Sequence, residues 1–208
     1  LIMTAPMIGN YGVCDEDIES LRPQVAGLIV REESRVVSSH RAVGALGAWL
    51  ASHEVPAISG VDTRALVRII RQQGAMSAVI SHDASLSDAQ LVELARSAVP
   101  MSGQNLAEGV TAAEVGTWED DLGEWNTHHD SDMRFKVVAI DCGAKANIYR
   151  HLISVGCEVV VVPYDSDAEA IRSHDPDGLF ISNGPGDPSA VEATIETLRA
   201  FAGEIPTF

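Results

Sequence analysis

The sequence predicts an α/β protein: an α+β amino-terminal domain, residues 1–116, followed by an open parallel-sheet domain, residues 134–208. After residue 134, β-branched apolar runs alternate with segments of helical periodicity, which is typical of parallel strands joined by helical crossovers. Before residue 116, strands and helices alternate without that rhythm. Residues 117–133 between them are rich in Asp and Glu and contain neither Lys nor Arg. Like charges resist collapse, so this stretch is predicted to be a solvated linker, anchored by Trp118 and Trp125.

Composition limits the class of protein. The 208 residues carry 14 basic and 30 acidic side chains, a formal net charge of −16, which disfavours binding to the phosphate backbone of nucleic acids. With 46% hydrophobic residues the chain is able to form a core, yet no apolar run approaches the roughly 20 residues that a membrane helix needs. Three widely spaced cysteines, an odd number, favour a reduced, cytoplasmic setting.

The elements of the first domain follow from short apolar runs and helix-capping signals. Asp62 is placed to cap a helix that Gly74 ends, and Ser87 with Gln90 forms the pattern of a capping box. The helix after Ser87 is expected to turn Leu91 and Leu94 inward. Strands are predicted at 27–30, 35–37, 55–58 and 75–81, and helices at 39–53, 64–73 and 87–98.

The second domain has a regular strand–helix order. Its second strand, Glu158–Val162, is almost entirely valine, as expected for a strand covered on both faces. Ser166 and Glu169 are predicted to cap a short helix that ends at Ser173. The other strands are predicted at 135–140 and 178–182, with a fourth opening at Ile205, and the other helices at 145–155 and 188–201.

Two segments lie where an open α/β sheet binds ligands, beyond the carboxyl ends of its strands. They are Asp141–Lys145, after the first strand, and Ser182–Pro188, after the third. The Gly-Pro-Gly bend of the second segment has little side-chain bulk, so a ligand is able to approach its N–H groups. Such a loop is suited to hold an oxyanion or a carboxylate, although the same residues also form ordinary turns. It is not a P-loop, because no Gly-Lys-Ser/Thr follows.

Neither the cysteines nor the histidines make a convincing catalytic centre. Cys142 lies at the ligand-binding end of its strand but lacks the Gly-x-Cys-x-Gly setting of a nucleophile, and Cys157 lies at the opposite end. Both are therefore predicted to be packing residues, and the acidic surroundings of Cys14 make it a poor nucleophile. A weak metal site is conceivable within His128–Asp132, but no second cluster completes it, so no metal is expected.

Several motifs together carry a family resemblance. Ser182–Pro188, SNGPGDP, matches a loop of the class I glutamine amidotransferases. Asp141–Ile148 resembles the first-strand motif of one branch of that class, the small (glutaminase) subunit of carbamoyl-phosphate synthetase. Further motifs resemble the amino-terminal domain of this subunit: Ile8–Gly12, Gln24–Leu28, Ile58–Leu66 and Leu106–Thr111. The resemblance runs along the whole chain in the order of the family.

The resemblance implies a fold and an activity. Residues 134–208 would form the first half of the amidotransferase domain. In the family, a cysteine thiolate assisted by a His-Glu pair hydrolyses glutamine, and the ammonia passes to a large subunit. That subunit uses ATP, Mg and bicarbonate to make carbamoyl phosphate for arginine and pyrimidine synthesis. The expected partners are therefore glutamine and the large subunit, with no cofactor on this chain.

The resemblance also assigns roles to individual residues. The amide of Gly184 would be an oxyanion-hole donor, Gly184 and Gly186 would contact glutamine, and Asn183 and Asp187 would shape the loop. Lys145 would face the ammonia exit or the subunit interface.

No catalytic residue is expected in this chain, because the nucleophile and the His-Glu pair of the family would lie beyond residue 208. The chain is therefore expected to be an internal fragment, inactive alone as a glutaminase. Its open sheet edge predicts aggregation or dimerisation.

Three other interpretations stay open. Another class I glutaminase subunit, of the anthranilate- or GMP-forming kind, would lack the domain at residues 1–115. A non-catalytic interaction module would keep the fold without the nucleophile. A fused multifunctional pyrimidine enzyme would contain the same residues.

Overall fold

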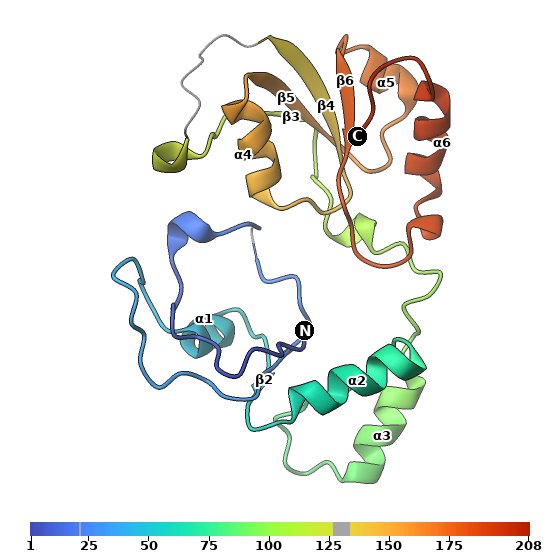
Figure 1. The fold of residues 1–208 in the computed structure, drawn as a ribbon. Helices are drawn as coiled ribbons and strands as arrows, with labels where there is room; N and C mark the ends of the chain where they lie inside the picture. The colour runs from blue at the N-terminus through green and yellow to red at the C-terminus, as the bar shows by residue number, and fades with distance from the viewer. Residues whose placement is uncertain (21, 127–133) are drawn as a thin grey trace. The chain divides into compact units, whose positions relative to one another are not determined.

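The structure is a computed structural model that describes residues 1–20, 22–126 and 134–208 (Figure 1). The chain forms two compact units, Leu1–Pro100 and Met101–Phe208. The composition shift near residue 116 is therefore not the boundary between them. The reason is that the segment after residue 100 packs on the second sheet and supplies one of its strands.

The first unit is built around a small parallel sheet. Its core consists of Leu28, Val30 and Leu50, with Ile8, Leu46 and Trp49 packed against them. The two strands pair in register, with Leu28 opposite Ala57. The elements are η1 (Asp15–Asp17), β1 (Leu28–Ile29), α1 (Leu46–Ser52), β2 (Ala57–Ile58), α2 (Thr63–Gln73) and α3 (Asp88–Ser97).

Both predicted helix caps of the first unit are confirmed. The Asp62 carboxylate accepts a hydrogen bond from the Ala65 N–H at 3.0 Å, and Gly74 ends α2 with a positive φ of 90°. Ser87 and Gln90 form the reciprocal capping box of α3. The inward orientation expected for Leu94 is wrong, since this residue is 48% exposed.

Three predicted elements of the first unit differ in the structure. Residues 39–45 are not helical, because residues 40 and 41 form a turn and Gly44 pairs with Val13 in an antiparallel bridge. Residues 35–37 and 75–81 form no strand, since a strand needs a partner ladder and neither segment pairs with one.

The second unit contains a four-stranded sheet with the order β3-β5-β4-β6. The strands β4, β5 and β6 run parallel, as predicted, and β3 is antiparallel to β5. The strands are β3 (Gly116–Trp118), β4 (Phe135–Asp141), β5 (Cys157–Pro163) and β6 (Gly178–Ile181). The helices are η2 (Ala107–Gly109), η3 (Gly123–Trp125), α4 (Ala146–Ser154), α5 (Ala168–Arg172), η4 (Pro188–Ala190) and α6 (Glu192–Phe201).

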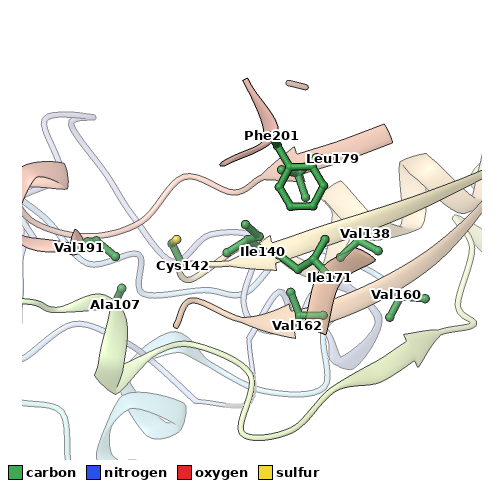
Figure 2. Close-up of a cluster of buried hydrophobic side chains, with 10 residues drawn as sticks. All are labelled: Ala107, Val138, Ile140, Cys142, Val160, Val162, Ile171, Leu179, Val191 and Phe201. Atoms are coloured by element: carbon green, nitrogen blue, oxygen red, sulfur yellow. The ribbon is translucent and has the colours of Figure 1, made fainter. Parts of the chain in front are cut away.

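Alternate residues of the central strands pack on opposite faces of this sheet. Figure 2 shows one face, where Val138 and Ile140 of β4 meet Ile171 of α5 and Phe201 of α6. On the other face, Ala139 and its valine neighbours on β5 pack against Tyr149 of α4. The unit is thus a three-layer α/β arrangement, which supports the predicted fold class for this half of the chain.

Several details of the second unit differ from the predictions. The linker was expected to begin at Thr117, but Thr117 and Trp118 belong to β3. The Trp118 ring packs against Tyr149 with a centroid distance of 5.1 Å, as expected of an anchor, whereas Trp125 is 65% exposed. Asp167 rather than Ser166 caps α5.

The carboxyl-terminal elements also differ in detail. The predicted helix 188–201 is interrupted at Val191, which ends η4 and precedes α6. The fourth strand is represented by a parallel bridge between Thr207 and Leu179. The N–H groups of Leu179 and Ile181 in β6 donate to the carbonyls of Pro206 and Phe208, and the Phe208 N–H donates to the carbonyl of Leu179. Among the described residues, no helix is long and apolar enough to cross a membrane.

Candidate functional site

The two predicted ligand-binding segments meet at one edge of the sheet. Because β4 and β6 are adjacent parallel strands, with Ile140 opposite Ile181, the loops that follow them leave the sheet side by side. The contact is close: a Cβ built on Gly184 would lie 2.5 Å from the carbonyl oxygen of Cys142. The absence of a side chain at position 184 therefore allows the second loop to rest on the backbone of the first.

A buried carboxylate organises the first loop. Asp141, the last residue of β4, is 7% exposed. Its Oδ1 accepts hydrogen bonds from the N–H groups of Gly143 and Ala144 at 2.9 and 2.8 Å, and its Oδ2 accepts one from Ala112 at 2.7 Å. Three backbone donors compensate the loss of water around this charge. They also fix the turn that carries Lys145.

Residues 105–112 lie across the carboxyl ends of the strands and tie them together. The Thr111 hydroxyl donates to the carbonyl of Asp141 at 2.6 Å and accepts from the N–H of Tyr164, just after β5, at 3.0 Å. Ala107 in this segment is fully buried in the main core. The segment is thus part of the framework under the loop edge.

Ser182 connects the two loops. Its hydroxyl accepts a hydrogen bond from the N–H of Cys142 at 2.8 Å and donates one to the carbonyl of Asn183, also at 2.8 Å. The residue is 6% exposed, so these bonds are shielded from water. Ser182 therefore links the end of β4 to the start of the Gly-Pro-Gly bend.

The Gly-Pro-Gly bend itself is open. Asn183, Gly184, Pro185 and Gly186 are all exposed. Within the part of the chain that the structure describes, the amides of Gly184 and Gly186 donate no hydrogen bond. Gly186 has a positive φ of 81°, and a Cβ there would lie 3.2 Å from Leu106. The bend therefore presents free main-chain donors on a constrained backbone.

Asp187 lies where the bend enters η4. Its carboxylate accepts a hydrogen bond from the N–H of Ser189 at 2.9 Å and serves as the N-cap residue of η4. The backbone and side-chain hydrogen bonds from Ser189 lower the pKa of this carboxyl. This geometry is compatible with the loop-shaping role predicted for Asp187.

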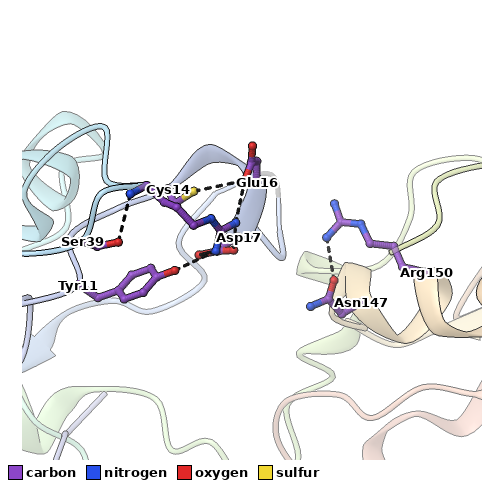
Figure 3. Close-up of polar contacts among 8 residues, drawn as sticks. Tyr11, Cys14, Glu16, Asp17, Ser39, Asn147 and Arg150 are labelled. Carbon is purple, nitrogen blue, oxygen red and sulfur yellow. Dashed lines mark hydrogen bonds and ion pairs between the residues drawn. The ribbon is translucent and has the colours of Figure 1, made fainter. Parts of the chain in front are cut away.

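Lys145 is the N-cap residue of α4 and is exposed, without a side-chain bond to the helix end. Two residues later, the Asn147 side chain accepts a hydrogen bond from Arg150 at 2.9 Å, as Figure 3 shows. Lys145 is the last residue of the loop that follows β4. None of the contacts among the described residues assigns a role to its side chain.

The cysteines fit packing roles better than catalytic ones. Cys142 is 7% exposed, and burial raises the pKa of its thiol. Its Sγ lies 3.8 Å from the Thr194 hydroxyl, inside the main core. Burial also raises the pKa of the Cys157 thiol. At neutral pH both sulfurs are therefore protonated, which agrees with the prediction that they are packing residues.

Cys14 belongs to a polar cluster of the first unit (Figure 3). Its Sγ lies 4.0 Å from Glu16, whose carboxylate is paired with Arg41 at 2.7 Å. Arg41 also binds Asp17 at 2.9 Å and the Tyr11 hydroxyl at 2.9 Å. The cluster joins two segments of the first unit, residues 11–17 and 39–41, so its role is structural.

No metal centre is present among the residues that the structure describes, in the sense that no group of three suitable side chains gathers there. The weak candidate at His128–Asp132 lies outside the described residues.

Sequence reasoning placed Asp141, Ser182 and Thr111 in its segments and motifs, but it did not predict the hydrogen bonds by which they support the two loops. A local signal existed for Asp141, because an Asp two residues before a Gly at a strand end often accepts backbone bonds in a turn. The bonds of Thr111 reach residues 30 and 53 positions away along the chain, so no local pattern could have revealed them.

Comparison with known proteins supports two regions of the resemblance. Residues 1–80 match the family "Carbamoyl-phosphate synthase small chain, CPSase domain", and residues 138–208 match the family "Glutamine amidotransferase class-I". The first match favours this subunit over the glutaminase subunits that lack the amino-terminal domain.

Curated relatives match nearly the full chain. A carbamoyl phosphate synthase small chain of Syntrophotalea carbinolica is 42% identical over 99% of this chain and 55% of its own length. Those of Thermosynechococcus vestitus and Archaeoglobus fulgidus are 46% and 43% identical, over 96% and 99% of this chain and 53% and 54% of their own lengths. The chain thus spans about half the length of these relatives, and it belongs to the carbamoyl phosphate synthase small-chain family.

Proposed function

We propose that this chain supplies the oxyanion loop of a glutaminase that feeds ammonia to carbamoyl phosphate synthesis. In this proposal Gly184 donates its N–H to the oxygen of the glutamine side-chain amide as negative charge develops there. Gly186 contacts the substrate, while Asn183 and Asp187 hold the shape of the loop. Main-chain donors fixed in advance are effective in this role because they need not reorganise during the reaction.

One observation carries the proposal: the Gly184 amide is exposed and uncommitted within the described residues, on a loop that rests on the buried edge of the sheet. The alternative of an ordinary strand-to-helix turn explains the glycines equally well. It does not explain why the loop is bound from below through Ser182 while its outer donors stay free.

The nucleophile in this proposal is none of Cys14, Cys142 and Cys157. Cys142 is the nearest to the loop, but its sulfur is buried beside Thr194 and its raised pKa keeps it protonated. The 208-residue chain is therefore expected to be inactive alone as a glutaminase. The thiolate and its His-Glu partners would come from the remainder of a small chain of the length seen in the relatives.

The proposed partner is the large chain of carbamoyl phosphate synthase. ATP, Mg and bicarbonate would be used on that partner, and Lys145, exposed next to the loop edge, would lie toward the ammonia exit or the interface. The product would serve arginine and pyrimidine synthesis. The three cysteines of the chain form no disulfide, which fits the proposed cytoplasmic setting.

The test compares two preparations. The 208-residue chain, incubated with glutamine, is expected to release no glutamate above background. A complete small chain that contains these residues, paired with its large chain, is expected to make carbamoyl phosphate from glutamine. Cysteine-dependent turnover by the 208-residue chain would contradict the assignment of the nucleophile. A complete, folded pair that uses free ammonia but not glutamine would contradict the proposed function.

A further inference from the structure

We propose that Ser182 is a positioning residue that fixes the orientation of the Asn183–Gly184 peptide and thereby aims the Gly184 N–H outward. The inference rests on the proposed function, since it explains how the oxyanion donor is held ready before the substrate binds. The buried Ser182 hydroxyl would orient the peptide, a role that none of the exposed loop residues 183–186 performs.

The first step of the argument is the hydrogen bonding of Ser182. A serine hydroxyl has a single proton to donate, and here the proton goes to the carbonyl oxygen of Asn183 at 2.8 Å. The same oxygen atom accepts the N–H of Cys142 at 2.8 Å. The hydrogen bond from the Cys142 N–H holds the Ser182 oxygen in place, so the hydroxyl stays oriented toward the carbonyl of Asn183.

The second step is the geometry of the peptide unit. The Asn183–Gly184 peptide is trans, so its C=O and N–H point in opposite directions. Ser182 is 6% exposed and holds the C=O toward the protein interior. The N–H of Gly184 must therefore point away from the interior, which agrees with its exposure and with its lack of an acceptor among the described residues.

The third step is the consequence of losing this bond. Glycine restricts its neighbouring peptide planes less than any other residue, so the peptide before Gly184 has little intrinsic preference for one orientation. A flipped plane would present the carbonyl oxygen of Asn183 to the developing oxyanion. This would replace an attraction with a repulsion between two negative oxygens.

The test uses the complete small chain with its large-chain partner. Ser182→Ala removes the hydroxyl, whereas Ser182→Thr retains it, and Ser173→Ala is the matched control. The Ser173 hydroxyl donates to the carbonyl of Ala170 at 2.6 Å at the end of α5 and is exposed, so its loss changes a local bond away from the loop.

The expected result is a selective loss of the chemical step. Ser182→Ala should lower kcat for glutamine hydrolysis at least about tenfold, with a smaller change in KM, because the Gly184 donor acts mainly in the transition state. Synthesis from free ammonia should not change. Ser182→Thr should recover most of kcat, and Ser173→Ala should match the unmodified protein.

The outcomes separate this inference from the proposed function. If the unmodified pair lacks glutaminase activity, the proposed function fails. If it is active and Ser182→Ala retains its kcat, the positioning role is wrong. If Ser182→Ala does not fold, the orientation is measured in the unmodified 208-residue chain by hydrogen exchange of the Gly184 amide, which is fast when the N–H faces solvent and slow when it is bonded in the interior. An inward N–H in that measurement would overturn the inference.

Discussion

The carbonyl of Cys142 determines the choice of residue at position 184. A Cβ at this position would lie 2.5 Å from that oxygen and 3.0 Å from the Cys142 Cβ, and the obstacle is largely backbone that has no room to move. The glycine is therefore required by packing whatever its catalytic role. The same contact aligns the bend with the end of β4.

Gly184→Ala is expected to displace the bend and to weaken both stability and catalysis. Forced overlap in a packed region costs about 1–3 kcal/mol, and loss of one oxyanion donor lowers kcat about 10²–10³-fold. Urea unfolding of the chain and glutaminase assay of the complete pair measure the two effects. Gly109→Ala is the control, since nothing lies within 4 Å of a Cβ there. An unchanged unfolding midpoint for Gly184→Ala would contradict the structure.

Three weakly acidic side chains, two of them buried and one half-buried, give the chain a predictable response to alkaline pH. Burial raises the pKa of Cys142 and Cys157, and burial followed by the charge of Asp141 raises that of Tyr149. The folded chain thus retains these protons to higher pH than the unfolded chain does. The contribution of these three groups to stability should be constant below the ordinary thiol pKa of about 8.5 and be lost as the pH rises above it.

Two measurements check this response. Urea midpoints should be lower at about pH 9.5 than at about pH 7.5, in the direction set by linkage. Iodoacetamide at about pH 7.5 should modify Cys142 and Cys157 much more slowly in the folded chain than in urea, because the thiolate is the reactive form. Rapid labelling of Cys142 in the folded chain would show a thiolate and would contradict its packing role.

At the scale of elements, the segment 105–112 acts as a brace across the carboxyl ends of β4 and β5. Its only hydroxyl is that of Thr111, which bonds to both strand ends at once. The loops of the candidate site begin from these strand ends. The brace therefore limits how far the site is able to deform.

Thr111→Val is expected to destabilise the second unit by about 1–3 kcal/mol, because it leaves the Tyr164 N–H without its partner in a half-buried place. Thr111→Ser retains the hydroxyl and should lose much less. Chemical denaturation followed through Trp118, whose ring packs on Tyr149 of the same unit, measures the difference. Equal losses for the two variants would indicate that the methyl group, not the hydroxyl, is responsible.

The elements that the sequence predicts well are those with local causes. The cap residues of α2 and α3 form hydrogen bonds with residues only three positions further along the chain. The valine run of β5 predicts a strand that is buried on both faces. By contrast, β3 has three residues, Gly116–Trp118, and forms only because β5 offers a free edge. Periodicity predicts a helix over 39–53, but the helix begins only at Leu46, because Gly44 forms a bridge to Val13, 31 positions earlier.

In the candidate site, too, features with local causes could be predicted and features that depend on distant residues could not. The Gly-Pro-Gly bend is visible in the sequence because its residue types are unusual, and its position follows from the strand order. The supporting bonds of Ser182 and Thr111 join segments that are distant along the chain. They could not be predicted without knowledge of which strands are neighbours.

At the scale of the whole molecule, each compact unit has its own apolar core. Leu50 is central in the first, and Ile140, with no exposed surface, is central in the second. The sequence-based expectation of aggregation or dimerisation concerns the second unit, because its sheet carries the open edge. Sizing of the purified chain decides it.

Core truncations should separate the two units. Leu50→Ala and Ile140→Ala each remove buried methyl groups and should cost about 2–5 kcal/mol. Each is expected to lower mainly the transition of its own unit in calorimetry. The matched controls are Val36→Ala and Val155→Ala, at residues that are 68% and 58% exposed. Equal shifts of every transition by both core variants would show that the units unfold as one.

The order β3-β5-β4-β6 gives the second sheet two unlike margins. One is closed by a three-residue strand that runs against the others and is followed by Glu119, Asp120 and Asp121. Short length and negative charge both discourage a foreign strand from docking. The other margin, beyond β6, already accepts Pro206–Phe208 in parallel register. The second sheet is consequently able to accept a further strand at only one of its two edges, the edge beyond β6.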